Sequence, residues 1–175
     1  MKKIIFIILL ISQYSYAQFD ADRAFAYLEK QVSFGTREPG SKGHQVCLDF
    51  LNSELKLVAD NVRLQSFEFQ DIKLKKHFTL TNVIASFNPQ AKKRIFFAAH
   101  WDTRPRADYE VKDKRSIPIA GANDGASGVA VLLEIAQQLK ANPPAIGVDL
   151  IFFDGEDYGE EGHLDYYFLG SRYFA

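Results

Sequence analysis

Two short apolar runs separated by one helix-length segment constrain this chain more than any other feature. Residues 95–99 read Ile-Phe-Phe-Ala-Ala and residues 148–153 read Val-Asp-Leu-Ile-Phe-Phe, a composition typical of strands covered on both faces. Between them, residues 126–141 carry apolar side chains at helical spacing. A strand, a helix and a strand of these lengths predict a right-handed crossover that makes the two strands parallel neighbours.

The preceding part of the chain predicts two helices and two more strands. Residues 19–34 have helical spacing behind Asp20 as the N-cap, and residues 41–59 start with a capping serine. Residues 61–69 and 73–87 are strand-rich and are expected to form a hairpin or meander along one edge. We therefore predict an α/β fold in one domain: a mixed sheet with a parallel centre, flanked by helices.

Composition excludes several classes of protein. The 175 residues are 47% hydrophobic and 25% charged, which is typical of globular proteins and not of disordered chains. Lys and Arg number 21 against 22 Asp and Glu, so no bulk positive charge attracts nucleic acid or an anionic membrane. The single cysteine excludes a disulfide framework within these residues.

The first seventeen residues have the pattern of a secretory signal peptide. Two lysines precede an apolar run over residues 4–11, and small residues stand three and one positions before a cleavage site after Ala17. A run of this length is too short to span roughly 30 Å of hydrocarbon, so we expect no stable membrane anchor. A buried N-terminal strand or helix is the alternative. We predict a signal peptide over residues 1–17, a mature chain over residues 18–175 that starts at Gln18, and a periplasmic or secreted protein.

Polar residues able to bind a metal follow the two predicted parallel strands directly. The candidate site residues are His100, Trp101, Asp102, Asp124, Asp154, Glu156 and Asp157. Ligands of open α/β sheets bind beyond the carboxyl ends of the strands, where these segments meet. Clustered carboxylates repel one another unless a cation joins them, and a histidine among them favours zinc over magnesium or calcium.

Each of these residues taken alone also has an ordinary structural explanation. Asp124 could be the N-cap of the helix that follows it, and His100 could be a strand-end histidine bonded to the backbone. The acids after the second strand could be loop residues that favour solubility. Three such segments at one sheet edge, beside glycines, favour the metal site. The adjacent Glu156 and Asp157 suit a divided role, with one carboxylate on the metal and the other in proton transfer.

Five motifs also occur in a recognisable order: Phe34-Gly-Thr-Arg37, Asn82-Val-Ile-Ala85, His100-Trp-Asp102, Gly121-Ala-Asn-Asp-Gly-Ala-Ser-Gly128 and Phe152-Phe-Asp-Gly-Glu-Asp157. This order resembles metallopeptidase family 28, the zinc aminopeptidases, over nearly all of the predicted mature chain. The segment Phe87-Asn-Pro-Gln-Ala-Lys92, Trp101 and Leu169-Gly-Ser-Arg172 are similar to the glutaminyl cyclase branch of that family.

The resemblance implies a role for each site residue. Asp124 and Asp157 would bind zinc, although many relatives carry Glu at the second position, and Glu156 would be the general acid and base. Residues 100–102 would support the metal or line its pocket. One zinc ion is expected for a cyclase and two for an aminopeptidase. The family's remaining zinc ligand is a histidine far downstream, so we expect residues 18–175 to be the N-terminal part of a longer zinc-dependent domain, incomplete at its C-terminal side.

The implied reaction converts the N-terminal glutamine of a peptide or protein to pyroglutamate with release of ammonia, a glutaminyl-peptide cyclotransferase activity. A zinc aminopeptidase, in which Glu156 would activate water, is the first alternative. A non-catalytic peptide-binding fragment of the same fold is the second. In each case the expected partner is a peptide or protein N-terminus and not a nucleic acid.

Overall fold

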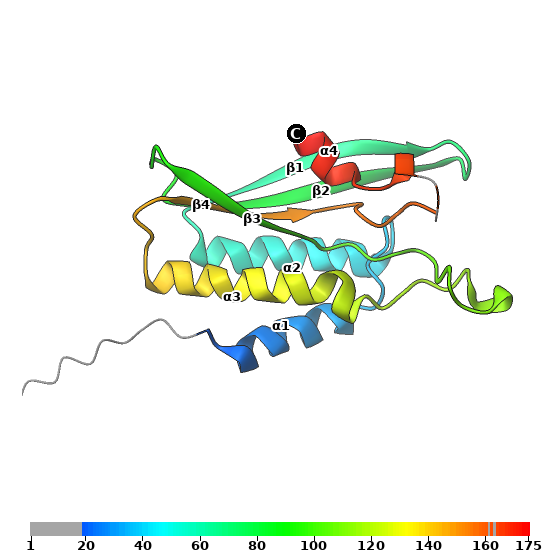
Figure 1. Cartoon of the computed structure of the whole chain (residues 1–175), viewed down its shortest axis with the longest axis horizontal. Coiled ribbons are helices and arrows are strands. Elements are labelled where there is room, and N and C mark those ends of the chain that lie inside the picture. The colour runs from blue at the N-terminus through cyan, green and yellow to red at the C-terminus, as the bar shows by residue number, and fades with distance from the viewer. Residues whose placement is uncertain (1–18, 161, 163) are drawn as a thin grey trace, which may run out of the picture.

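Four strands form one mixed sheet in the order β1-β2-β4-β3 (Figure 1). The computed structural model describes residues 19–160, 162 and 164–175, so the predicted signal peptide lies outside the described residues. The strands are β1 Asn61–Asp71, β2 Lys76–Phe87, β3 Arg94–His100 and β4 Gly147–Phe153. Antiparallel pairing joins β1 to β2 and β2 to β4, whereas β3 and β4 are parallel. The hairpin and the parallel pair predicted from the sequence are both confirmed.

Three helices cover one face of this sheet (Figure 1). They are α1 Ala21–Ser33, α2 Lys42–Val58 and α3 Gly128–Ala141. The predicted caps are present: the Asp20 carboxylate accepts a hydrogen bond from the Arg23 amide at 2.9 Å, and the Ser41 hydroxyl accepts one from the His44 amide at 3.0 Å. α2 and α3 lie against the sheet, and α1 packs on the outer side of that layer (Figure 1). The predicted α/β class is confirmed.

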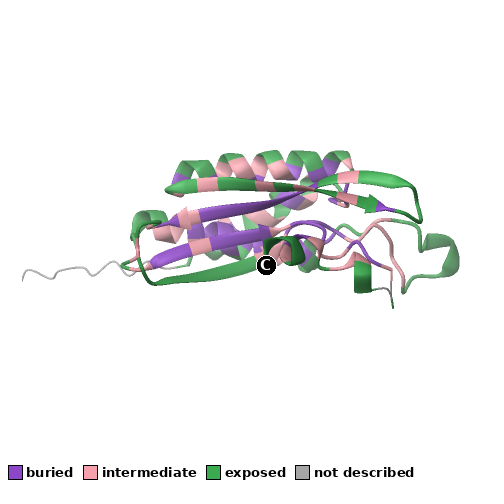
Figure 2. Ribbon diagram, turned by 90° about the horizontal axis from the view of Figure 1, so that it is seen from above, coloured by how far each residue is buried: buried purple, intermediate pink, exposed green. Residues whose placement is uncertain are grey.

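The hydrophobic core lies between α2, α3 and the sheet. Its most buried members alternate along β2 and β4 and repeat at helical spacing on the two helices: Cys47, Leu51, Leu55, Val83, Ala85, Phe87, Leu132, Leu133, Ala136, Val148, Leu150 and Phe152. Buried positions are accordingly concentrated on the two middle strands (Figure 2). Each large apolar side chain buried here stabilises the fold by about 1.5–3 kcal/mol relative to an exposed one.

The opposite face of the sheet is covered differently. Among the described residues, the short helix α4, Leu169–Phe174, is the helix on that side (Figure 1). β3 is the edge strand of the described sheet, and Ile95, Phe96 and Phe97 are 45%, 63% and 45% exposed. The prediction that this apolar run is covered on both faces is therefore wrong for the described chain, because β3 has a strand neighbour on one side only and its contacts with α3 leave these three side chains largely exposed.

A long connection leaves the sheet between β3 and α3 and extends beyond the carboxyl ends of the strands (Figure 1). We call residues 104–119 of this connection the excursion; they contain one short 3-10 turn, Lys112–Lys114. α3 starts at Gly128 rather than at the predicted residue 126, because Ala122–Ser127 form a wider turn in which Asp124 has extended backbone angles. In the part of the chain that the structure describes, no helix combines the length and apolar character needed to cross a membrane.

Candidate metal and acid/base site

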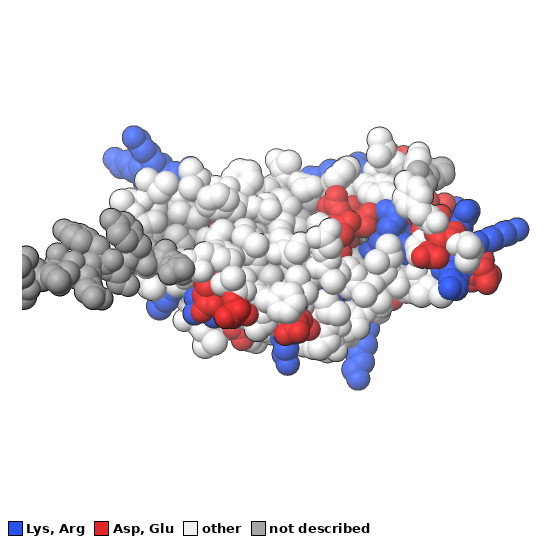
Figure 3. Space-filling view, turned by 60° about the horizontal axis from the view of Figure 1, so that its bottom comes forward, with Lys and Arg blue, Asp and Glu red and all other residues white. Residues whose placement is uncertain are grey.

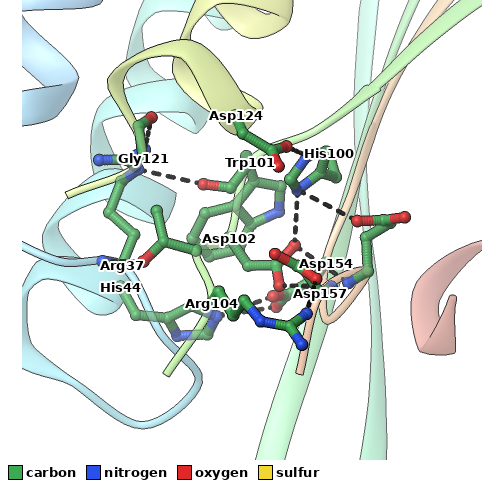
Figure 4. A network of polar contacts seen from close by, with 12 residues as sticks. Arg37, His44, His100, Trp101, Asp102, Arg104, Gly121, Asp124, Asp154 and Asp157 are labelled. Carbon is green, nitrogen blue, oxygen red and sulfur yellow. Dashed lines mark hydrogen bonds and ion pairs between the residues drawn. The ribbon is translucent and has the colours of Figure 1, made fainter. Parts of the chain in front are cut away.

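β3 and β4 end at the same rim of the sheet and deliver two sets of side chains there. His100 at the end of β3 lies opposite Phe153 at the end of β4, so residues 100–102 and 154–157 leave the sheet next to each other. Asp124 reaches the same rim from the turn before α3 (Figure 4). The structure thus brings His100, Asp102, Asp124, Glu156 and Asp157 into one polar network.

The Asp102 side chain binds the backbone of residues 154–157, the loop after β4 that we call the acidic loop. Its carboxylate is fully buried and accepts the amide of Glu156 on Oδ1 at 3.0 Å and the amide of Asp157 on Oδ2 at 3.2 Å. The same Oδ1 lies 3.3 Å from Nδ1 of His100. Asp102 therefore fixes where the next two carboxylates stand.

His100 and Asp124 form a second contact across the rim. Nε2 of His100 lies 2.8 Å from Oδ1 of Asp124, and Nδ1 lies 3.7 Å from Oε2 of Glu156. Burial lowers the pKa of His100, but Asp102, Glu156 and Asp124 outweigh it and raise the pKa to about 9. Asp124 is not the N-cap of α3, because Ser127 occupies that position and no side chain caps it. The ordinary explanation for Asp124 is thus excluded.

Glu156 and Asp157 are two carboxylates in unlike surroundings. Burial raises the pKa of Glu156; His100 opposes this in part, and the charges of Asp102 and Asp157 add to it. Burial also raises the pKa of Asp157, although Arg104 donates to its Oδ1 from Nη1 at 2.5 Å. Carboxylates with raised pKa values that face a cleft are typical of acid/base or metal chemistry.

Two carboxylates of the site, those of Asp124 and Asp157, are suited to bind a divalent cation. Asp124 and Asp157 line the same hollow, and the negative charge of Asp124 contributes to the raised pKa of Asp157. A cation held between them would remove this repulsion. The described residues contain no group of three or more His, Cys, Asp and Glu side chains that could hold a metal ion by itself. The other ligands of a zinc site would have to lie outside the described residues.

Trp101 lies beneath the site instead of lining it. Its side chain is fully buried in the core, its Nε1 donates to the carbonyl of Thr81 at 3.2 Å, and its ring stacks on His44 with centroids 4.4 Å apart. Trp101 therefore points into the core, while His100, one residue earlier, points toward Asp102 and Asp124 (Figure 4).

Buried partners missing from the sequence prediction support the rim from below. His44 of α2 lies 2.8 Å from Oδ1 of Asp154, the first residue after β4, and Asp154 also accepts the amide of Thr81. Asp154 is fully buried, so it belongs to this support and not to the hollow. No local pattern identifies the pair, because 110 residues separate its members.

Arg37 is a second buried support. Its guanidinium donates to the carbonyls of Trp101, Ala120 and Gly121 at 3.2, 3.1 and 2.8 Å. It thereby joins the segment after β3 to the turn that carries Asp124. Gly121 has φ of +62°, and a Cβ there would lie 2.2 Å from Thr103, so only glycine fits this junction. No role was predicted for Arg37 from the sequence, although its motif, Phe34-Gly-Thr-Arg37, could have drawn attention to it.

Arg104 forms the outer wall of the site. Its guanidinium donates to Asp108 as well as to Asp157 and lies 5.3 Å from the ring centroid of Tyr167. These residues line one hollow with Asp124, so the excursion and the acidic loop enclose the predicted metal ligands. The sequence analysis did not include Arg104.

Comparison with known proteins places this geometry in a family. Residues 82–175 match Peptidase family M28. A glutaminyl-peptide cyclotransferase of Drosophila melanogaster is 29% identical over 145 residues, a match that covers 79% of this chain and 38% of that protein. The chain therefore spans well under half the length of this relative.

Solved structures give the same result at higher identity. Tannerella forsythia glutaminyl cyclase has a TM-score of 0.84 and 41% identity over 90% of this chain and 56% of that chain. Bacteroides thetaiotaomicron glutaminyl cyclase bound to N-acetylhistamine and a Zn-dependent exopeptidase from Parabacteroides distasonis both have a TM-score of 0.85, with 41% and 40% identity and the same coverage. Since the family match also includes more than half of the chain, the chain belongs to peptidase family M28.

Proposed function

We propose that the complete protein is a glutaminyl-peptide cyclotransferase that converts N-terminal glutamine to pyroglutamate. The observation that carries this proposal is the Glu156–Asp157 pair, fixed by Asp102 opposite Asp124, in a chain 41% identical to two bacterial glutaminyl cyclases. The pair supplies one carboxylate for a metal and one for proton transfer, which is what the reaction needs.

Glu156 is the proton carrier in this proposal. The substrate's α-amine nitrogen attacks its own γ-carboxamide carbon, so a C–N bond forms while the bond to the amide nitrogen breaks and ammonia leaves. Glu156 accepts the proton of the attacking amine and returns it to the departing nitrogen. Its raised pKa, caused first by burial, makes it a better proton acceptor for this step. Tethering of the two reacting groups within one residue supplies part of the rate.

Asp124 and Asp157 are the proposed zinc ligands. A zinc ion, when bound, would supply Lewis-acid polarisation of the γ-carbonyl. Asp102 would hold both carboxylates of the acidic loop in place, and Arg104 would orient Asp157 through Oδ1. A cyclase of this kind would hold one zinc ion.

Export to the periplasm or the medium is part of the proposal. Its support is the leader pattern of residues 1–17, since cleavage after Ala17 would leave Gln18 at the mature terminus. That terminus is the substrate type of the proposed enzyme, so pyroglutamate is expected there.

An aminopeptidase is the second candidate. The observation in its favour is that a Zn-dependent exopeptidase and a leucine aminopeptidase precursor match as well as the cyclases do, at 40% and 41% identity. The contact between His100 and Asp124 at 2.8 Å also places a histidine where a second metal ion could bind.

Product analysis separates the two activities. The full-length protein, incubated with zinc and a synthetic peptide that starts with glutamine, should release one ammonia per peptide and leave the chain length unchanged. Loss of the first residue as a free amino acid would instead identify an aminopeptidase. Zinc content of one or two ions per chain provides a second, independent readout.

A further inference from the structure

We infer that the excursion selects the second residue of the substrate, with Ile119 favouring an apolar side chain there and the acids beside it disfavouring a carboxylate. This inference rests on the proposed function and adds the peptide class to it. Its basis is a hollow of about 540 Å³ that runs from the predicted metal ligands to the excursion.

The hollow has a reactive end and a recognition end. Asp124 and Asp157 line it from the sheet rim, while Tyr109, Ile119 and Tyr167 line it from the excursion and the segment before α4. A glutamine whose γ-carbonyl lies at the two carboxylates has its own α-carbon a few bonds away. In this inference, the residue that follows it enters the part of the hollow that Ile119 lines.

The side of the hollow that the excursion forms is fixed by contacts within the protein. The Ile119 amide donates to the Arg104 carbonyl at 3.0 Å, which closes the base of the excursion. Arg104 is itself fixed between Asp108 and Asp157. Ile119 is 39% exposed, so part of its side chain faces solvent that a substrate side chain could displace. A preformed apolar wall favours ligand burial without a cost of ordering.

The charge of the hollow is the basis for disfavouring an acidic second residue in the substrate. Four carboxylates, those of Asp108, Glu110, Asp124 and Asp157, and one guanidinium, that of Arg104, line the hollow. The end of the molecule that carries the excursion shows acidic and basic side chains crowded together (Figure 3). The local balance is negative even with a divalent cation bound, so it attracts a substrate amino terminus and repels an acidic side chain.

The test compares matched peptides with the full-length zinc protein. Peptides Gln-Leu and Gln-Gly measure the apolar contact, and Gln-Gln and Gln-Glu peptides of the same length measure charge at nearly constant shape. Ile119→Ser should lower the Gln-Leu to Gln-Gly ratio of kcat/KM by about three- to tenfold, chiefly through KM, because a partly exposed contact contributes less than a buried one. Glu110→Gln should raise the Gln-Glu rate relative to the Gln-Gln rate.

Two variants control for damage to the fold. Ile119→Val keeps the apolar wall and should keep the ratio. Ile117→Ser removes an isoleucine of the same excursion that is 54% exposed and is not among the described residues lining the hollow, so it should leave the ratio unchanged. An equal loss for both peptides in Ile119→Ser, or an unchanged ratio, would overturn the inference. Absence of ammonia release from every glutaminyl peptide would overturn the proposed function itself.

Discussion

Asp102 shows how one side chain can place two others without touching a ligand. Both of its oxygens are used by backbone amides of the acidic loop, and Oδ1 also faces His100. Asp102 is therefore a positioning residue, whereas Glu156 and Asp157 carry the proposed chemistry, and Asp157 lines the hollow.

Glu156→Gln and Asp157→Ala in the full-length protein separate the two proposed roles. Gln keeps the shape of Glu156 but cannot accept a proton, so zinc content should stay near normal while turnover falls by about two to four orders of magnitude. Asp157→Ala removes a metal bond, so zinc affinity should fall and the melting temperature should depend less on added zinc. Metal analysis and kinetics on both variants provide the measurement.

A loop acid serves as the control for these two variants. Asp165→Asn changes one charge in the segment before α4, where the backbone carbonyl of Asp165 accepts a hydrogen bond from Arg172, and it should behave like the wild type. If Glu156→Gln lost the zinc while Asp157→Ala kept it, the assigned roles would be reversed.

Arg37 joins two segments of the chain, the one after β3 and the turn before α3. Arg37→Lys keeps the charge but cannot reach all three carbonyls, and each buried carbonyl left without a donor costs about 1–3 kcal/mol. We expect a lower melting temperature together with weaker zinc binding, because the turn that carries Asp124 loses its anchor. The exposed Arg63→Lys is the matched control. Loss of stability with unchanged zinc affinity would show that Arg37 supports the fold but not the site.

Glu134 fastens α1 to α3 and introduces a pH dependence. Its carboxylate is fully buried and accepts Nε and Nη2 of Arg23 at 2.6 and 2.9 Å and the Asp20 amide at 3.0 Å. Burial alone would raise the pKa of Glu134, but these hydrogen bonds outweigh it and lower the pKa. The resulting stabilisation is fully present above the pKa of an unfolded glutamate and is lost as the pH falls through the lower folded pKa.

Glu134→Gln should accordingly lower the free energy of unfolding by about 1–2 kcal/mol at neutral pH, a modest value because Arg23 is partly exposed. The difference between variant and wild type should shrink as the pH falls below about 4. Urea titrations at several pH values measure it. Glu29→Gln, which alters an exposed residue of the same helix pair, should show no such pH dependence. A difference that persisted in acid would contradict the assigned origin.

The positions of the helices and strands could be predicted from the sequence better than the burial of individual residues within them. Local signals suffice for a cap such as Asp20, which is confirmed. Exposure along α1 depends on distant contacts: Phe25 is 60% exposed, whereas Gln31 is buried and donates to the Ala126 carbonyl at 3.1 Å. Such contacts join segments 95 residues apart, and no local pattern encodes them.

At the site, the sequence placed the carboxylates but not what holds them. Glu156 and Asp157 stand directly after one predicted parallel strand and Asp124 just before the predicted crossover helix, and these positions were enough to bring them to one rim, since parallel strands end together. Arg104 lies in the excursion, which has little regular structure and therefore no period from which its direction could be predicted. The resemblance left open whether Trp101 supports the metal or lines its pocket, because successive residues of an extended segment point to opposite sides and the sequence does not fix which side Trp101 takes.

At the scale of the molecule, the exposed side of β3 predicts self-association of residues 18–175 produced alone. Phe96 is 63% exposed on an edge strand next to Ile95 and Phe97, and an apolar edge with unpaired backbone groups favours pairing between chains. Sedimentation should detect oligomers or aggregates, which Phe96→Lys should reduce. A monodisperse monomer with a cooperative melt would refute this prediction. We also expect no cyclase turnover from this chain, because its described residues offer two metal ligands.

The bonds from Asp102 to the acidic loop also bear on the order of folding. They join residues 54 and 55 positions apart, and the intervening chain contains the excursion, all of α3 and all of β4. Closing so long a loop costs entropy before any contact is gained, and parallel pairing is among the slower steps of folding. We expect the acidic cluster to be absent from a nascent chain until β4 has joined β3. A ribosome-bound chain ending before β4 would then hold no preformed site for a metal to enter.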